Sequence, residues 1–408
     1  MHFTRRAALG ATAGLLAAPS LRAQPADVIR IGVLTDLAGP YRDVTGPTSV
    51  ACVRQAVEEF TAANPAVRVE IITADHQNKP DVGINTVRQW FDQRGVDIVT
   101  DVGNSAIALG INPVCVEKDK LHLNASAGTS DLTGRACTPN SIHWAYDTYC
   151  LSNTSGTALT KAGGDRWYFV TADYAFGHAI ERDTTRFIEA AGGKMLGASR
   201  YPFPQTTDFS AFLLQAKASG AKVLGLAMAG DDLINCVKQA QEFGLTRSMK
   251  LAAIIGSITA VVASGLQTMQ GMYIAETFWW DLDDRTRGFT RRVQQKLPAG
   301  VFPNYVHAAN YSGVLHYLKA VQVLGVARAK ASGREVVAQM KRMPTDDDAF
   351  GQGLIREDGR KLHPSYLLEV KKPGESRYPG DVYRLAATIP GDQAFRPLSE
   401  GACPMIRS

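Results

Sequence analysis

The chain has 408 residues, which leaves room for two domains of about 150 residues or more. Its composition, 45% hydrophobic and 20% charged residues, is typical of a folded soluble protein and excludes disordered and collagen-like classes. Beyond the first thirty residues no segment reaches the ~18 uninterrupted apolar residues of a membrane span, so we expect no integral membrane protein. The formal charge of +5 falls to +2 without the three arginines of a predicted leader, which is too little to indicate a nucleic-acid partner.

Residues 1–23 are typical of an export signal. Arg5 and Arg6 precede an apolar stretch of small residues that is too short to cross a bilayer, and we expect cleavage after Ala23. The paired arginines favour the twin-arginine route. The alternative, a buried helix, needs polar residues on one face of the stretch, which contains only Thr12.

Export places the six cysteines in an oxidising compartment, where disulfides form. Cys52, Cys115 and Cys236 lie in apolar helical patterns and are expected to be buried thiols. Cys137 and Cys403 lie in loop-like, proline-containing contexts and form our candidate disulfide among the 15 possible pairings. No cysteine or histidine has the spacing of a metal site, and we expect no metal or cofactor.

From Val28 onward, short β-branched runs alternate with helical patterns, which is typical of a parallel sheet covered by helices. We predict strands over 28–34, 67–73, 98–99 and 121–125, and helices after Gly46-Pro47, through 82–90 and over 105–117. A second series has strands over 167–170, 194–201, 223–227, 250–255 and 272–275, and helices over 176–191, 209–219 and 231–243. The chain therefore contains two α/β units.

After the second series, two helical patterns over 286–296 and 306–324 have no strands of their own. We expect them to return to cover the first sheet. Residues 345–359 are interpreted as another crossing between the units, residues 366–370 as a late strand of the second sheet, and residues 390–408 as a tail without periodicity.

Ligands of open α/β sheets bind beyond the carboxyl ends of the strands, where helix N-termini offer N–H groups. Three loops of small residues lie at such ends: Gly103–Ser105, Ser126–Ser130 and Ala229–Asp231. The first two follow successive strands and together suit a carboxylate, although each alone is also explained as a helix cap.

Aromatic residues cluster near the same strand ends, at Tyr41, Tyr174, Phe176 and Phe278–Trp280. Together they suit the apolar or aromatic body of a ligand. The alternative is core packing, and for Trp280 packing at the hinge.

Motifs of catalysis are mostly missing: the sequence contains no glycine-rich phosphate loop and no H-E-x-x-H. Ser126 lies in Asn124–Gly128, which lacks the first glycine of a G-x-S-x-G elbow. A secreted serine hydrolase therefore needs a histidine brought to Ser126 by folding, and we expect the protein not to be an enzyme.

These features resemble the type I periplasmic solute-binding proteins, specifically the branched-chain amino acid binding (leucine/isoleucine/valine-binding protein-like) family of ABC importers. The resemblance covers essentially the whole mature chain and is carried by Ile31–Tyr41, Ala127–Leu132, Asp173–Gly177 and Tyr305–Ala320. It implies two Rossmann-like lobes with parallel sheets, joined by a three-crossing hinge that closes on the ligand. Lobe 1 would hold residues 24–145 and 279–345, lobe 2 residues 146–278 and 346–389, followed by the tail 390–408.

The resemblance also implies a periplasmic location, an ABC permease and ATPase as partners, and a carboxylate site at Ser105 and Ala127–Thr129. Amino-acid-binding members have an acidic residue where this chain has Ser257, and an unpaired ammonium in a closed cleft is costly. Asp231 or Glu276 could substitute, which keeps an amino acid or amide ligand open. A sensory receptor on the same fold also stays open.

Residues 132–149 resemble a branch of the family that takes up aromatic and other carboxylic acids. We therefore predict a small carboxylate with an aromatic or apolar body. The candidate ligand-binding residues are Tyr41, Ser105, Ser126, Ala127, Gly128, Thr129, Tyr174, Phe176, Asp231, Ser257 and Phe278.

Overall fold

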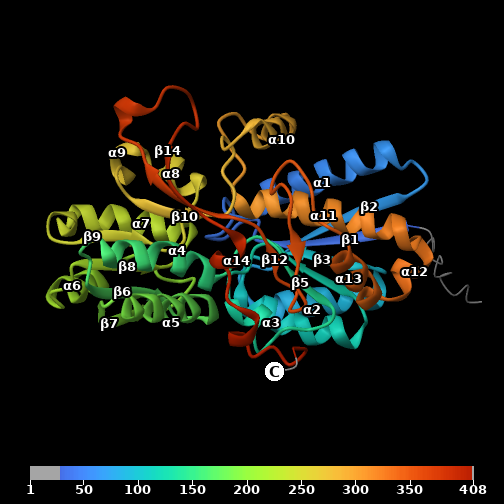
Figure 1. The fold of residues 1–408 in the computed structure, drawn as a ribbon, viewed down its shortest axis with the longest axis horizontal. Coiled ribbons are helices and arrows are strands. Elements are labelled where there is room, and N and C mark those ends of the chain that lie inside the picture. Colours follow the sequence, from blue (N-terminus) through green and yellow to red (C-terminus); the bar gives the residue numbers. More distant parts are fainter. Residues whose placement is uncertain (1–27, 407–408) are drawn as a thin grey trace, which may run out of the picture.

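A computed structural model describes residues 28–406, and the predicted export signal lies outside the described residues. Two sheets lie side by side along the long axis of the molecule (Figure 1). The first is entirely parallel, with strand order β2-β1-β3-β4-β5. Its strands are β1 Val28–Thr35, β2 Arg68–Asp75, β3 Ile98–Asp101, β4 Leu121–Asn124 and β5 Ser141–His143.

The second sheet has the order β14-β13-β10-β9-β8-β6-β7. Its strands are β6 Arg166–Ala172, β7 Lys194–Tyr201, β8 Val223–Ala227, β9 Lys250–Ala253, β10 Tyr273–Glu276, β13 Ser365–Val370 and β14 Tyr383–Ile389. Strands β6 to β10 pair in parallel, whereas β13 and β14 are antiparallel additions at one edge. The predicted α/β class with parallel central sheets is confirmed.

Helices from two distant parts of the sequence cover the first sheet; we call sheet and helices the first lobe. They are α1 Gly46–Ala63, α2 Pro80–Gln93, α3 Ser105–Glu117, α10 Asp284–Gln294, α11 Tyr305–Leu324, α12 Val326–Ala331 and α13 Gly333–Arg342. Helix α11 packs on α1 and also contacts β3, and α10 contacts α1. The predicted return of the late helices to the first sheet is therefore confirmed (Figure 1).

The second lobe contains the second sheet with α4 Thr148–Lys161, α5 Ala175–Ala190, α6 Ser210–Ala218, α7 Gly230–Glu242, α8 Ile258–Ser264 and α9 Leu266–Met269. The sequence analysis missed α4, which is rich in serine and threonine yet largely buried. Its hydroxyls bond back to the preceding turn: Thr154 Oγ1 donates to Cys150 O at 2.9 Å and Ser155 Oγ to Leu151 O at 2.7 Å. Burial therefore needs no apolar stripe here.

The segment before β13 differs from the prediction. The sequence predicts residues 346–363 in lobe 2, but β11 Leu354–Ile355 contacts α13, and Arg360 pairs with His143 at the edge of the first sheet. Arg360 is buried there, and its guanidinium donates to Tyr146 O at 3.0 Å. The chain joins the second sheet only at Ser365, so this crossing comes later than expected. The division into lobes otherwise stays a prediction.

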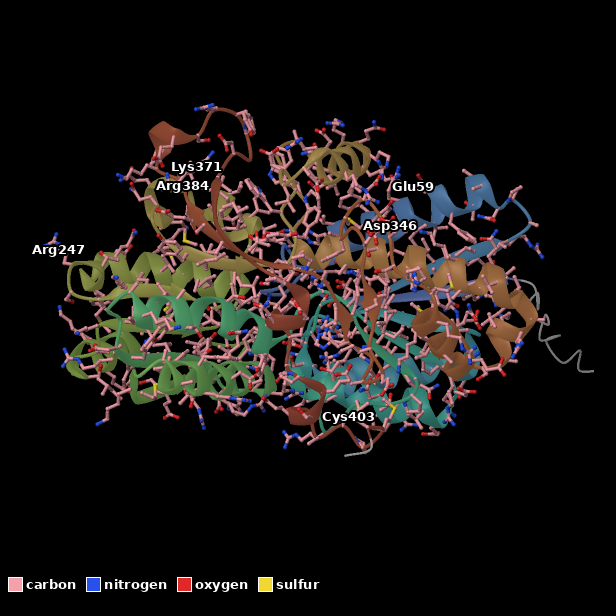
Figure 2. All side chains as sticks on the ribbon, viewed as in Figure 1. Glu59, Arg247, Asp346, Lys371, Arg384 and Cys403 are labelled. Atoms are coloured by element: carbon pink, nitrogen blue, oxygen red, sulfur yellow. A yellow bond between two sulfur atoms is a disulfide. The ribbon has the colours of Figure 1, made fainter. Side chains whose placement is uncertain are left out.

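The C-terminal tail contacts both lobes. Helix α14 Gly391–Ala394 packs on α4, and Glu400 pairs with Arg186 of α5 at 2.5 Å. Further along, Cys403 forms the predicted disulfide with Cys137 of the first lobe, with Cα atoms 5.6 Å apart (Figure 2). The predicted buried thiols Cys52, Cys115 and Cys236 are confirmed, and Cys150 is a fourth that the sequence analysis missed.

We predict that Cys403→Ser lowers the free energy of unfolding by about 2–4 kcal/mol, because the disulfide closes a long loop of the unfolded chain. Thermal unfolding with and without reductant measures the effect. Reductant should lower the Tm of the wild-type protein and leave that of Cys403→Ser unchanged. An equal loss in both proteins would contradict the assignment.

Candidate ligand-binding site

The two predicted carboxylate loops meet at the carboxyl ends of β3 and β4. Asn104 caps α3, because its side chain accepts hydrogen bonds from Ala106 N at 2.9 Å and Ile107 N at 3.2 Å. The neighbouring Ser105 Oγ accepts a hydrogen bond from Thr129 N at 3.3 Å. The first loop is thus held against the second by a side-chain hydrogen bond between them.

Several amides predicted to hold a carboxylate already have partners. Ser126 N donates to Asp101 O at 3.1 Å, and Ala127 N donates to Asn124 Oδ1 at 3.1 Å. With Thr129 N bonded to Ser105, three amides of this loop are occupied within the protein. The helix-cap interpretation therefore describes part of this region, and a ligand must exchange hydrogen bonds to use these groups.

Asp101 is a buried residue of this site that the sequence analysis missed. Ser126 Oγ donates a hydrogen bond to its carboxylate, and Asn310 Nδ2 donates to Oδ1 at 3.0 Å. Asp101 and Val102 have φ angles of 73° and 58°, a conformation that is uncommon outside glycine. Burial raises the pKa of Asp101. Among the described residues no histidine hydrogen-bonds Ser126, so nothing here supports the hydrolase alternative.

Three stacked aromatic rings connect the lobes. Phe203, which follows β7, stacks on Tyr41 with ring centroids 5.1 Å apart and on Tyr174 at 4.7 Å. The hydroxyls of Tyr41 and Tyr174 lie 2.6 Å apart. Burial raises the pKa of both tyrosines, so their hydroxyls stay protonated at neutral pH. Phe176, 5.9 Å from Tyr174, extends the layer. The sequence analysis missed Phe203, although it closely follows the carboxyl end of β7.

The loop after β1 also touches the second lobe through its backbone. Asp36 folds this loop by accepting from Gly39 N at 2.6 Å and Tyr41 N at 2.9 Å. Pro40 O then accepts from Asp231 N, at the start of α7, at 3.1 Å. Asp231 is exposed as a residue. The neighbouring protein still removes part of the water around its carboxylate, and this loss, with the charges of Asp43 and Asp36, raises the pKa of Asp231.

A small cavity of about 10 Å³ remains between the lobes, enough for about one water molecule. Four predicted residues line it: Tyr41, Ser126, Tyr174 and Phe176. Tyr146, which was not predicted, lines it too and donates from its hydroxyl to Ser126 O at 2.8 Å. The other lining residues are Val44, Thr45, Gly103, Ala229 and Ile255. A ring-sized ligand therefore enters only when lobes or side chains move apart.

The remaining predicted residues lie around this cavity or away from it. Gly128 fits between two rings, because a Cβ there would lie 2.7 Å from Tyr146 and 2.9 Å from Phe176. Ser257 precedes α8, and its hydroxyl lies 2.7 Å from that of Thr259. Phe278 packs in the core, so the core-packing alternative holds for it; its ring contacts are Phe289 at 5.8 Å and Phe350 at 6.2 Å. Seven of the predicted residues do not line the cavity: Ser105, Ala127, Gly128, Thr129, Asp231, Ser257 and Phe278.

Glu276, the alternative ammonium partner, ends β10 and is 1% exposed. Its Oε1 atom has no hydrogen-bond partner within the described residues. Burial raises its pKa to about 8, so the side chain is mostly neutral at pH 7.

Comparison with known proteins identifies the class. A model of the periplasmic binding protein family matches residues 28–375. The chain belongs to this family, which confirms the resemblance found in the sequence. No curated protein matches significantly. Among the described residues no helix combines the length and apolar character needed to cross a membrane.

Solved structures agree over nearly the whole chain. A periplasmic binding protein from Burkholderia mallei is 43% identical, with a TM-score of 0.88 over 94% of this chain and 100% of its own. A branched chain amino acid ABC transporter periplasmic ligand-binding protein from Burkholderia xenovorans is 38% identical, with a TM-score of 0.79 over 92% and 99%. An ABC transporter solute-binding protein from R. palustris in complex with 4-hydroxybenzoate shares the fold, at 19% identity and a TM-score of 0.79 over 90% and 98%.

We predict that Glu276→Gln flattens the dependence of Tm on pH between 5 and 8. The folded state raises the pKa of Glu276 from 4.5 to about 8, so it holds a proton that the unfolded chain releases in this window. Stability contributed by that proton is lost as the pH rises. Wild-type Tm should therefore fall from pH 5 to pH 8 by about 2 °C or more beyond the fall in the variant. Parallel profiles would contradict a buried neutral carboxyl.

Proposed function

We propose that the protein is the periplasmic solute-binding component of an ABC uptake system. In this role it captures a small carboxylate with an aromatic or apolar body between its lobes and delivers it to a membrane permease with an ATPase. The chain itself carries out no chemistry. The observation that carries the proposal is the layer of Tyr41, Phe203 and Tyr174, which joins the two lobes beside the Ser126 loop.

The aromatic layer favours a flat ligand body. Its rings already stack at 4.7–5.1 Å, the spacing of aromatic rings in direct contact, so a flat ligand could take the place of one ring that moves aside. The fold neighbour from R. palustris bound to 4-hydroxybenzoate supports this ligand class.

The polar groups near this layer favour an anionic end. The hydroxyls of Tyr41 and Tyr174 lie at the cavity, and because one donates to the other, the second O–H is left to donate to a carboxylate. Burial raises the pKa of Asp101, and hydrogen bonds from Ser126 Oγ and Asn310 Nδ2 offset part of the negative charge that a carboxylate would meet there. An ammonium group, by contrast, finds a mostly neutral Glu276 and an exposed Asp231.

A thermal-shift series tests the ligand class. Benzoate and 4-hydroxybenzoate should raise the Tm of the mature protein, since a ligand at 100 times its Kd stabilises the folded state by about 2.7 kcal/mol. Benzyl alcohol, which lacks the carboxylate, is the matched control and should have a much smaller effect. Stabilisation by leucine but not by the aromatic acids would overturn the proposal.

Closure of the lobes should depend on Gly230, whose φ of 60° and lack of a side chain allow α7 to meet Pro40. A Cβ there would lie 2.1 Å from Pro40 O. We predict that Gly230→Ala weakens ligand affinity about tenfold or more and that scattering shows a more open molecule. Gly220→Ala is the matched control, because Gly220 has a φ of 69° and a Cβ added to it would have no neighbour within 4 Å. Equal effects of both substitutions would contradict the role of closure.

A branched-chain amino acid is the second candidate ligand, favoured by the 38% identical protein from Burkholderia xenovorans. It requires an acidic partner for the ammonium group. Glu276→Gln and Asp231→Asn would then abolish leucine binding, whereas binding of an aromatic acid would survive both substitutions.

A further inference from the structure

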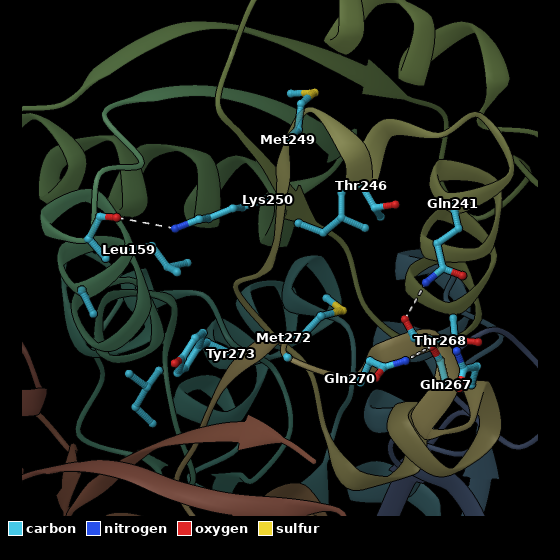
Figure 3. Close-up of a pocket in the computed structure, with 15 residues that line it drawn as sticks. Leu159, Gln241, Thr246, Met249, Lys250, Gln267, Thr268, Gln270, Met272 and Tyr273 are labelled. Atoms are coloured by element: carbon cyan, nitrogen blue, oxygen red, sulfur yellow. Dashed lines mark hydrogen bonds between the residues drawn. The ribbon is translucent and has the colours of Figure 1, made fainter. Parts of the chain in front are cut away.

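A second, larger cavity lies at the opposite end of the second sheet from the interlobe residues. Its volume is about 720 Å³, and it includes Lys250 and Leu251 at the start of β9 (Figure 3). Ile255, which follows the other end of the same strand, lines the interlobe cavity. The length of β9 therefore separates the two cavities, and an occupant of one does not touch the other.

The inner surface of this cavity is apolar and adaptable. The buried side chains of Met249, Met272, Leu159 and Leu367 line it, with the partly buried ring of Tyr273 (Figure 3). Methionine side chains have flexible, polarisable thioethers that fit ligands of irregular shape. The volume also falls within the range of roughly 300–1,000 Å³ that is usual for small-molecule sites.

The only charge among the residues that line the cavity is positive. Lys250 is exposed and is the only charged residue among those that line the cavity. Its Nζ donates to Ala162 O over a long 3.5 Å, which leaves further N–H groups for a ligand. The amides of Gln241 and Gln270 are instead bonded to backbone carbonyls, at 2.7 Å to Thr268 O and 3.0 Å to Gln267 O (Figure 3).

We propose that this cavity is a second binding site, specific for an amphipathic monocarboxylate. The apolar body of the ligand packs on the methionine and leucine side chains, and its carboxylate pairs with Lys250 Nζ. A cationic ligand finds no carboxylate among the lining residues, and a polyanion finds only one cation. The proposal does not depend on which ligand occupies the interlobe site.

Calorimetric titration with octanoate tests the proposal, with 1-octanol as the uncharged probe. The wild-type protein should bind one equivalent of octanoate at this site. Lys250→Gln should weaken octanoate binding at least fivefold and leave 1-octanol binding unchanged. Lys217→Gln, on the exposed face of α6, is the matched control and should behave as the wild type. No saturable octanoate binding, or equal affinity in Lys250→Gln, would overturn the proposal.

The Gly230→Ala variant separates this site from the interlobe site. Octanoate should bind to it as tightly as to the wild type, because Gly230 lies at the contact with Pro40 and not at the second cavity. Octanoate binding that fell in Gly230→Ala and survived in Lys250→Gln would place the ligand between the lobes and overturn the proposal.

Discussion

The contact on which the rest of the site depends is the one between the loop after β1 and the start of α7. Asp231 N donates a hydrogen bond to Pro40 O at 3.1 Å. The ring of the next residue, Tyr41, stacks on Phe203, which also stacks on Tyr174. Both lobes therefore supply the walls of one small cavity. Because the contact involves backbone atoms at Pro40 and at Gly230, side-chain rearrangement alone does not relieve it.

Other groups hold the lobes together away from the cavity. Arg182 of α5 pairs with Asp131 of the first lobe at 3.2 Å, and Ser130 Oγ donates to Asp183 at 2.7 Å. The tail adds a covalent anchor to the first lobe through Cys403 and an ion pair to α5 through Glu400. The arginines of both ion pairs are about half exposed, at 47% for Arg182 and 53% for Arg186, so each pair contributes only about 0–1 kcal/mol to holding the lobes together.

The strands and most helices follow from local pattern, because buried parallel strands are β-branched runs and the helices between them carry an apolar face. Helix α4 does not follow from local pattern, because serine and threonine side chains make up much of its buried surface. The position of residues 346–363 does not follow either, because it depends on the hydrogen bond from Arg360 to Tyr146 O, which is distant in the sequence. Residue type at the strand ends indicates where a site lies. It does not reveal which amides are already bonded, because partners such as Ser105 and Thr129 are separated by 24 residues.

The predicted aromatic residues lie in different surroundings for the same reason. Tyr41, Tyr174 and Phe176 reach the cavity, whereas Phe278, with the same residue type and a similar place at a strand end, turns into the core against Phe289. The direction of a side chain beyond a strand depends on what packs around it, and a single sequence does not contain that information. Phe203 was missed although it follows the end of β7, because a single sequence does not show that its ring stacks on both Tyr41 and Tyr174.

Three buried acids, at the end of β3, in the first turn of α7 and at the end of β10, affect which charge a ligand can carry. Burial raises the pKa of Asp101, that of Asp232 to about 6 and that of Glu276 to about 8. Glu276, which is mostly neutral at pH 7, adds little negative charge against a carboxylate ligand. Asp232 is mostly ionised at pH 7, but it already accepts the Tyr201 hydroxyl at 2.7 Å and does not line the cavity. An ammonium ligand that paired with Glu276 would have to expel the proton of that side chain. The burial that keeps Glu276 neutral therefore removes one acidic partner that an amine would need.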